Sequence, residues 1–351
     1  MLQLRSEQTL ENTLRLPAVS KAHYELDAVD AHSLASPGLK AILKDPDLLI
    51  IGGGSNLVFA SPEIKHSLSI SANHWQVLRQ SPSHVWIVAE AGLSLDVLVR
   101  QTTRYGWFGL ERLAEIPGTI GAAPIQNVGA YGREIADLLN WVEAVDRKTG
   151  QICRFTRAAC RFSYRQSIFK QQPERWLITR VGLRLKRKST ADSIFAHPGV
   201  QHAAKQLGYN IKNNDIPADP KVIAEIIRAV RLAKLPDWRD PHAPGSVGSF
   251  FHNPVISRKQ FNRLRKKFGA VPGFATADQE KIKIPAGWLI EQRGWRGVVR
   301  GSVGVYADHA LVLVHFGAGS GAELLSLANE IIADIKNHYG ITLVIEPRVL
   351  P

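Results

Sequence analysis

The chain has 351 residues, 45% of them apolar and 21% charged, which is enough for two or three domains with a substantial core. It has no run of about 18 or more apolar residues and no apolar block at its N-terminus, so we expect neither membrane insertion nor secretion. Cys153 and Cys160 fit neither a disulfide framework nor a zinc site, and we expect a reduced, cytoplasmic protein without a metal. The formal net charge of +13 favours a polyanionic partner.

A glycine-rich loop is the first motif with chemical meaning. It lies between apolar runs at 48–51 and 57–59, which predicts strand, loop and strand. The loop residues are Gly52, Gly53, Gly54, Ser55 and Asn56. Their backbone N–H groups can form a nest for a phosphate, because glycine lets a ligand approach closely. The loop has no Walker lysine and does not open a helix as a dinucleotide fingerprint does, and a tight hairpin connection is the alternative.

A second glycine-rich stretch follows a helix that we expect to run from Ser94 to Gly106. This stretch, 109–133, is too long and too apolar for a flexible linker. Its small residues could form the wall of a site for a large flat cofactor, with Gln126 and Asn127 as hydrogen-bonding groups. The predicted wall residues are Ile116, Pro117, Gly118, Gly121, Ala122, Gln126, Asn127, Gly129, Ala130 and Tyr131. A buried glycine-rich crossover is the alternative.

The rest of the chain mixes strands and helices in an α+β order. Strands are expected near 141–145 and 176–185, and the polar stretch 186–219 is the expected domain boundary. Asp219 is placed to cap a helix that stops before Pro236.

A basic amphipathic helix is expected before Gly269, with Phe261, Leu264 and Phe268 on its apolar face. Its outer face would carry Arg258, Lys259, Arg263, Arg265, Lys266 and Lys267. No stacking platform or DNA-reading motif accompanies these cations, so we interpret them as a solvated face and expect no nucleic-acid partner.

The last helix is expected to begin with a capping box formed by Ser320 and Glu323, and to end at Gly340. A strand over 342–345 should follow and deliver Glu346 near the C-terminus.

Ser249 has unusual neighbours. It lies between Gly248 and two rings, those of Phe250 and Phe251, before a turn signal at 253–254. A hydroxyl that the rings partly shield from water could deliver a proton to one chosen atom. An ordinary serine at a strand end is the simpler interpretation.

Six motifs in this order resemble the UDP-N-acetylenolpyruvoylglucosamine reductases, flavoenzymes of the second step of peptidoglycan precursor synthesis. The resemblance extends from about Asn12 to Glu346 and points to the longer-chain members of the family. The motifs are residues 51–57, 116–132, 164–170, 245–254, 286–291 and 346–347.

The resemblance implies an α+β chain with two domains. An FAD-binding domain of the vanillyl-alcohol-oxidase (PCMH) type would span 15–190, in lobes at about 15–72 and 73–190. A substrate-binding domain would span 215–346, and its last strand would return Glu346 to the active site. The implied cofactors are FAD and NADPH. The implied substrate is the enolpyruvyl ether of UDP-N-acetylglucosamine, which is reduced to UDP-N-acetylmuramate.

The resemblance also implies a catalytic trio. Arg165 and Glu346, the latter especially with a pKa raised by burial, would stabilise the charge that develops on the substrate carboxylate. Ser249 would donate a proton to the adjacent carbon. Without the resemblance, a structural ion pair for Arg165, a surface glutamate at 346 and a turn serine are the simpler interpretations.

Four residues match the family's contacts to the substrate diphosphate and sugar. They are Arg231, Lys234, Asn253 and Lys283. The chain departs from the family at His252, where many relatives have lysine. It also lacks the tyrosine that longer members place over the diphosphate; the equivalent stretch is 195–199, and His197 or Tyr209 could substitute.

Two alternatives remain at this stage. One is a different FAD oxidoreductase of the same fold, acting on an alcohol or a sugar, against which the motifs around Ser249 and Glu346 argue. The other is a basic nucleic-acid-binding protein. Oligomeric state and the NADPH contacts do not follow from the sequence.

Overall fold

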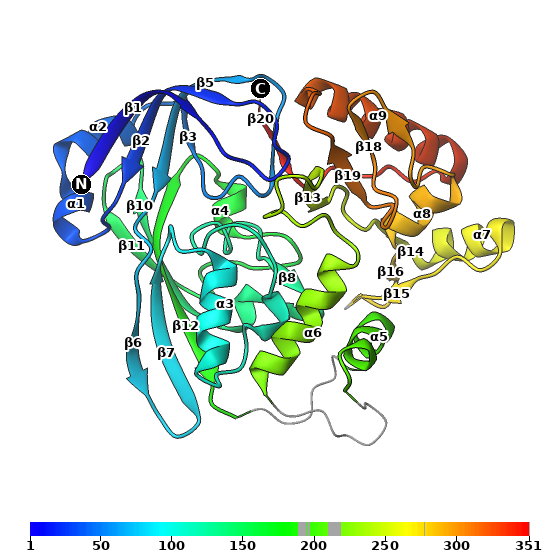
Figure 1. Cartoon of the computed structure of the whole chain (residues 1–351), viewed down its shortest axis with the longest axis horizontal. Coiled ribbons are helices and arrows are strands. Elements are labelled where there is room, and N and C mark those ends of the chain that lie inside the picture. Colours follow the sequence, from blue (N-terminus) through cyan, green and yellow to red (C-terminus); the bar gives the residue numbers. More distant parts are fainter. Residues whose placement is uncertain (189–194, 196, 210–218, 277, 351) are drawn as a thin grey trace. The chain divides into compact units, whose positions relative to one another are not determined.

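The computed structural model describes residues 1–188, 195, 197–209, 219–276 and 278–350 (Figure 1). They form two compact units. Unit 1 consists of Met1–Thr9, Val19–Gly53 and Glu63–Leu232, and unit 2 of Leu10–Ala18, Gly54–Pro62 and Ala233–Pro351. The chain therefore passes from one unit to the other within the glycine loop 52–56. The functional division at 15–190 and 215–346 stays a prediction, and the compact units divide the chain elsewhere.

Unit 1 contains two large sheets. The first has the strand order β1-β2-β5-β3, with β5 parallel to both of its neighbours, and the second is antiparallel in the order β11-β10-β12-β7-β6. The strands of the unit are β1 Leu2–Thr9, β2 Val19–Leu26, β3 Leu48–Ile50, β5 Glu63–Ile70, β6 Trp75–Gln80, β7 His84–Glu90, β8 Gly129–Ala130, β9 Arg133–Glu134, β10 Leu139–Asp146, β11 Ile152–Thr156 and β12 Trp176–Lys186.

Helices α3 and α6 lie side by side next to the second sheet (Figure 1). Leu98 and Val99 of α3 and Ile226 and Ile227 of α6 are fully buried in one core with β7, β10 and β12. The helices of the unit are α1 Ala31–Ala35, α2 Pro37–Leu43, α3 Leu95–Arg104, η1 Glu111–Leu113, η2 Ile135–Asp137, α4 Ile168–Gln171, α5 Pro198–Gln206 and α6 Pro220–Leu232. Asp219 caps α6 as predicted, because its carboxylate accepts a hydrogen bond from the Lys221 N–H at 2.8 Å.

Unit 2 has smaller sheets, in the orders β13-β19-β18-β17 and β14-β16-β15, and a parallel pair of β20 with β4. Its elements are β4 Leu57–Phe59, β13 Gly245–Ser249, β14 Val255–Ser257, α7 Arg258–Phe268, β15 Phe274–Ala275, β16 Lys281–Lys283, α8 Ala286–Gln292, β17 Val299–Arg300, β18 Val303–Val305, β19 Val312–His315, α9 Gly321–Tyr339 and β20 Arg348–Leu350. The predicted capping box of α9 is present, and Gly340 ends the helix in the left-handed conformation.

The two strands predicted on either side of the glycine loop are present. Strands β3 and β4 flank the glycine loop as predicted, but they belong to different sheets, so the loop is not a hairpin connection.

The predicted strand over 342–345 is wrong. The chain there is extended but makes one β-bridge, between Phe251 and Ile345. Leu343 is buried and Val344 exposed, which reproduces the alternation of a strand. The apolar pattern therefore predicts which side chains are exposed, but not whether the segment pairs with another strand. Pro347 also has no N–H group with which to continue a β-ladder.

No helix in the described part of the chain has the length and apolar character to cross a membrane.

Candidate active site

Within unit 1, the glycine loop contacts the predicted cofactor wall through backbone. A Cβ added to Gly53 would lie 3.1 Å from the Cα of Gly118, and one added to Gly52 would lie 2.7 Å from Oγ1 of Thr119. A side chain at either glycine would crowd the wall segment, while Gly52 and Gly53 themselves are exposed. Such a cradle suits a phosphate-bearing cofactor that must approach the backbone closely.

Asn127 does not play the role that the sequence suggests. Its side chain is fully buried, donates to Glu134 Oε2 at 2.6 Å and to the Ser163 carbonyl at 3.2 Å, and accepts from the Ala136 N–H at 3.2 Å. The side-chain amide is therefore committed to the protein and not available to a cofactor. It instead ties the wall to Ser163, at the start of the turn that contains Arg165.

Arg165 lies in a tight turn of unit 1. Ser163 and Gln166 exchange backbone hydrogen bonds across this turn, and Arg165 has a φ of 55°, in the left-handed region. Its Nη2 donates to the Gly129 carbonyl at 3.0 Å, and Lys170 Nζ donates to the Arg165 carbonyl at 3.1 Å. These contacts fix the guanidinium beside the cofactor wall.

Arg231 is the second cation of this region. Its Nε donates to the Glu115 carbonyl at 3.2 Å. Burial lowers the pKa of Arg231; the neighbouring charges of Tyr131, Glu115 and Asp96 oppose the shift, and Arg165 adds to it. Burial likewise raises the pKa of Tyr131. Arg165, Arg231 and Tyr131 therefore lie close enough for their charges to interact.

A buried ion network that sequence reasoning missed supports Arg231. Arg228 on α6 contacts Asp96 Oδ1 at 3.1 Å and Glu115 Oε2 at 3.2 Å, while Arg100 Nε contacts Asp96 Oδ2 at 2.7 Å. Asp96 and Glu115 are each 3% exposed, and the Glu115 N–H donates to Asp96 at 2.8 Å. The spacing of Asp96 and Arg100, four residues apart on a helix, was the only signal in the sequence.

The Asp96→Asn variant should lose stability in a pH-dependent way. Burial alone would raise the pKa of Asp96, but the Glu115 N–H and the guanidinium groups of Arg100 and Arg228 outweigh burial, so the pKa lies below the ordinary 3.8. A depressed pKa stabilises the fold above that ordinary value, and the contribution is lost as the pH falls through the folded value. We expect a loss of about 3 kcal/mol at neutral pH, shrinking below pH 3.8.

Denaturant unfolding followed from pH 7 to pH 3 measures this difference. Asp47→Asn is the matched control, because the Asp47 carboxylate is paired with Lys65 at 2.9 Å but is 51% exposed and should contribute little. An equal loss in both variants, or a loss that does not change with pH, would contradict the assignment.

In unit 2, a β-bulge sets the direction of Ser249. The register between β13 and β19 shifts between Ser246 and Ser249, and Gly248 has a φ of 73° with open space around it, a conformation that favours glycine. Ser249 is exposed, whereas Phe250 and Phe251 are buried in the core. The expected shielding of the hydroxyl by these two rings is therefore wrong, because the rings point into the unit.

The chain around Glu346 lies alongside residues 250–252. The Glu346 N–H donates to the Phe250 carbonyl at 2.9 Å, and the His252 N–H donates to the Val344 carbonyl at 2.9 Å. His252 Nδ1 lies 3.3 Å from Glu346 Oε2, and the glutamate side chain is 9% exposed. His252, where the chain departs from the family pattern, is thus the neighbour of the predicted catalytic carboxylate. The structure thus holds Glu346 beside the segment 249–252 of unit 2.

Comparison with known proteins agrees with this organisation. Residues 43–156 match a model of an FAD binding domain, and residues 240–350 match the C-terminal domain of UDP-N-acetylenolpyruvoylglucosamine reductase. The UDP-N-acetylenolpyruvoylglucosamine reductase of Pseudomonas aeruginosa is 38% identical over 348 residues, which cover 99% of this chain and 97% of the relative. That of Alcanivorax borkumensis is 36% identical, with 97% and 94% covered. The chain belongs to the UDP-N-acetylenolpyruvoylglucosamine reductase family.

A solved structure supports the same fold. The crystal structure of UDP-N-acetylenolpyruvylglucosamine reductase from Thermus caldophilus aligns with 100% of this chain and 99% of its own, at a TM-score of 0.63 and 19% identity. The predicted family, the two-part α+β fold class and the class of FAD-binding oxidoreductase are therefore confirmed.

Arg231 lies in unit 1, and the other three residues that match substrate contacts of the reductase family lie in unit 2. Lys234 is exposed and lies near His309, whose pKa is lowered by burial and then by this lysine. Asn253 Oδ1 accepts from the Ala286 N–H at 2.9 Å, so it also fixes the start of α8. Lys283 is half-buried on β16. His309 is a further neighbour that the sequence did not single out.

The two residues that could substitute for the missing family tyrosine have different surroundings within unit 1. The His197 ring lies edge-on to Tyr131, with ring centroids 5.7 Å apart, and is exposed at the start of α5. Tyr209 packs against the hydrophobic core. His197 is therefore the better placed of the two.

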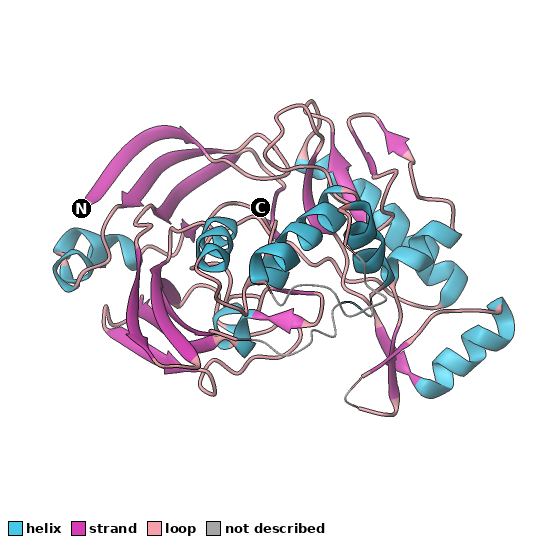
Figure 2. Ribbon diagram, turned by 60° about the horizontal axis from the view of Figure 1, so that its bottom comes forward, coloured by secondary structure: helices cyan, strands magenta, loops and turns pink. Residues whose placement is uncertain are grey.

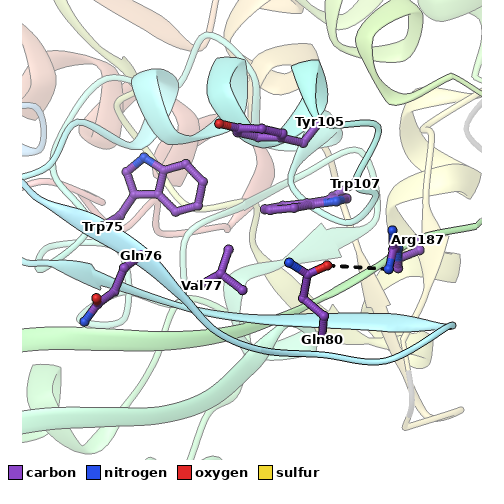
Figure 3. A pocket seen from close by; sticks show the side chains of 7 residues that line it. All are labelled: Trp75, Gln76, Val77, Gln80, Tyr105, Trp107 and Arg187. Carbon is purple, nitrogen blue, oxygen red and sulfur yellow. Dashed lines mark hydrogen bonds between the residues drawn. The ribbon is translucent and has the colours of Figure 1, made fainter.

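A pocket of about 510 Å³ in unit 1 is lined by none of the predicted site residues. Tyr105 stacks on Trp107 with ring centroids 4.9 Å apart, and Trp75 meets both edge-on (Figure 3). Gln80 and Arg187 close one side, joined by a hydrogen bond of 3.5 Å. This aromatic box lies beside the edge strand β6.

Proposed function

We propose that this chain reduces the enolpyruvyl ether of UDP-N-acetylglucosamine to UDP-N-acetylmuramate with NADPH, through bound FAD, in peptidoglycan precursor synthesis in the cytoplasm. Membership of the reductase family supports the reaction. The observation that carries the residue roles is the backbone pairing that holds Glu346 beside the segment of Ser249 and His252.

The residues of the cradle fit FAD. Gly52 and Gly53 would hold its phosphates through backbone N–H groups, and the wall 116–131 would lie along the cofactor. Gly54, Ser55 and Asn56 continue the same loop. FAD, when bound, supplies the hydride that NADPH provides.

Ser249 donates the proton. Reduction of the enolpyruvyl double bond adds a hydride to the methylene carbon and a proton to the carbon that bears the carboxylate. An exposed hydroxyl is free to face a substrate, whereas one covered by Phe250 and Phe251 would not be. A serine is a poor acid in water, so the hydroxyl must be aimed at the accepting carbon, and the bulge at Gly248 fixes its direction.

Arg165 and Glu346 act on the charge that develops on the substrate carboxylate. The guanidinium of Arg165 presents fixed charged donors to it. Glu346 is largely buried and has His252 as neighbour, and it takes part in stabilising the same group. Arg231, Lys234, Asn253 and Lys283 hold the diphosphate and sugar.

The first test of this function is the absorbance spectrum of the purified protein. The purified protein should show flavin absorbance, and its NADPH oxidation should require enolpyruvyl-UDP-N-acetylglucosamine. Oxidation that depends instead on an alcohol or sugar acceptor would favour another FAD oxidoreductase of this fold. A protein that stays colourless after incubation with FAD would overturn both.

A further inference from the structure

Helix α7 carries an unbalanced strip of positive charge. Residues 258–277 include six lysines and arginines and no aspartate or glutamate. All six cations are exposed. They are Arg258, Lys259, Arg263, Arg265, Lys266 and Lys267. In the described part of the chain, no ion pair joins any of them to a carboxylate.

Three of the six cations occupy the side of α7 that faces away from the protein, and the other three lie on its flanks. At 100° per residue, Lys259 and Lys266 fall within about 20° of the direction opposite the buried face, and Arg263 falls within about 60°. That buried face is formed by Leu264, which is 6% exposed, and by Phe268, which packs against Tyr339 of α9 with ring centroids 4.9 Å apart. Figure 2 shows α7 at the lower right, at the outer edge of unit 2.

The strip is not explained by the stability of the helix. Cations in the last turn, such as Arg265 and Lys267, are favourable to the helix dipole, but Arg258 and Lys259 lie in the first turn, where cations are unfavourable and no acidic residue balances them. Lys259 and Arg263 also repel each other at a spacing of four residues. Because these cations reduce the stability of α7, the charge is better explained by an anionic partner that neutralises it.

We propose that the outer face of α7 binds the anionic surface of a lipid bilayer peripherally. The three outermost cations are spread along about 10 Å of the helix axis. A plane of headgroup phosphates can reach all three at once, and each cation near such a surface strengthens binding about fivefold.

A nucleic acid fits this surface less well. Single strands are bound through exposed aromatic rings between the cations, and the rings of α7, Phe261 and Phe268, pack against the core of unit 2. The remaining exposed side chain on the outer line is Asn262, which offers no stacking surface. The helix thus offers charge without a base-binding platform.

Vesicle flotation of the FAD-loaded protein tests the proposal. The wild-type protein should float with vesicles containing about 30% anionic phospholipid and not with neutral phosphatidylcholine, and salt should weaken binding. The variant Lys259→Glu, Arg263→Glu and Lys266→Glu should bind about 100-fold or more weakly with unchanged NADPH oxidation. The corresponding triple alanine variant, which retains helix propensity, should show the same direction.

The matched control replaces Lys44, Lys205 and Lys221 by glutamate. These lysines are exposed in unit 1, directly after α2, on α5 and on α6. Both triple variants lower the formal charge from +13 by the same amount. Retained flotation of the control supports a site on α7, and equal losses would overturn it. Failure of the wild-type protein to float also overturns the proposal, as does binding to poly-uridylate in preference to anionic vesicles.

Discussion

Replacing Ser249 by alanine should leave the NADPH-dependent loss of flavin absorbance nearly unchanged. Recovery of that absorbance on addition of the enolpyruvyl substrate should slow by about 10²- to 10⁴-fold, the usual contribution of a positioned proton donor. The reason is that only the second half-reaction places a proton on carbon. Stopped-flow absorbance of each half-reaction separately measures both rates.

The strand itself offers the control. Ser246 lies on the same strand, β13, but on the other side of the bulge, where it pairs with Val314. Ser246→Ala should therefore change neither half-reaction appreciably. Equal slowing of both half-reactions in Ser249→Ala would show that Ser249 supports the fold of the site and does not donate the proton.

The direction of the Ser249 side chain could not be read from the sequence. The sequence places the two rings of Phe250 and Phe251 next to the serine, but the bulge that turns Ser249 away from them is a property of strand pairing. Gly248 was the only local sign, since a positive φ before a strand end favours glycine. Which strand β19 pairs with, and in which register, cannot be read from local residue patterns.

The contacts of Asn127 and His252 are a second feature of the site that the sequence does not predict. Both stand within motifs of the family, yet each has a partner far away in the chain, Ser163 for Asn127 and Glu346 for His252. Helices with capping signals, such as α6 and α9, depend on neighbouring residues and were predictable. Contacts between distant segments depend on the fold and were not.

Replacing Arg165 by lysine should slow the second half-reaction by about 10²- to 10³-fold, the usual cost of removing one aimed donor to a developing anion. Lysine keeps the charge but loses the planar fork of the guanidinium, which here is already fixed by a 3.0 Å bond to the Gly129 carbonyl. Because the interaction strengthens as charge develops, the loss should appear mainly in kcat and less in KM.

Arg161→Lys is the matched control for this change. Arg161 also has a left-handed φ, 49°, lies four residues earlier, and is exposed, so steady-state kinetics should be unchanged. If Arg165→Lys raised KM alone, Arg165 would be a binding residue for the ground state. If it lowered the flavin content of the purified protein instead, its contact with Gly129 would serve the cofactor wall, and charge stabilisation would have to come from Arg231.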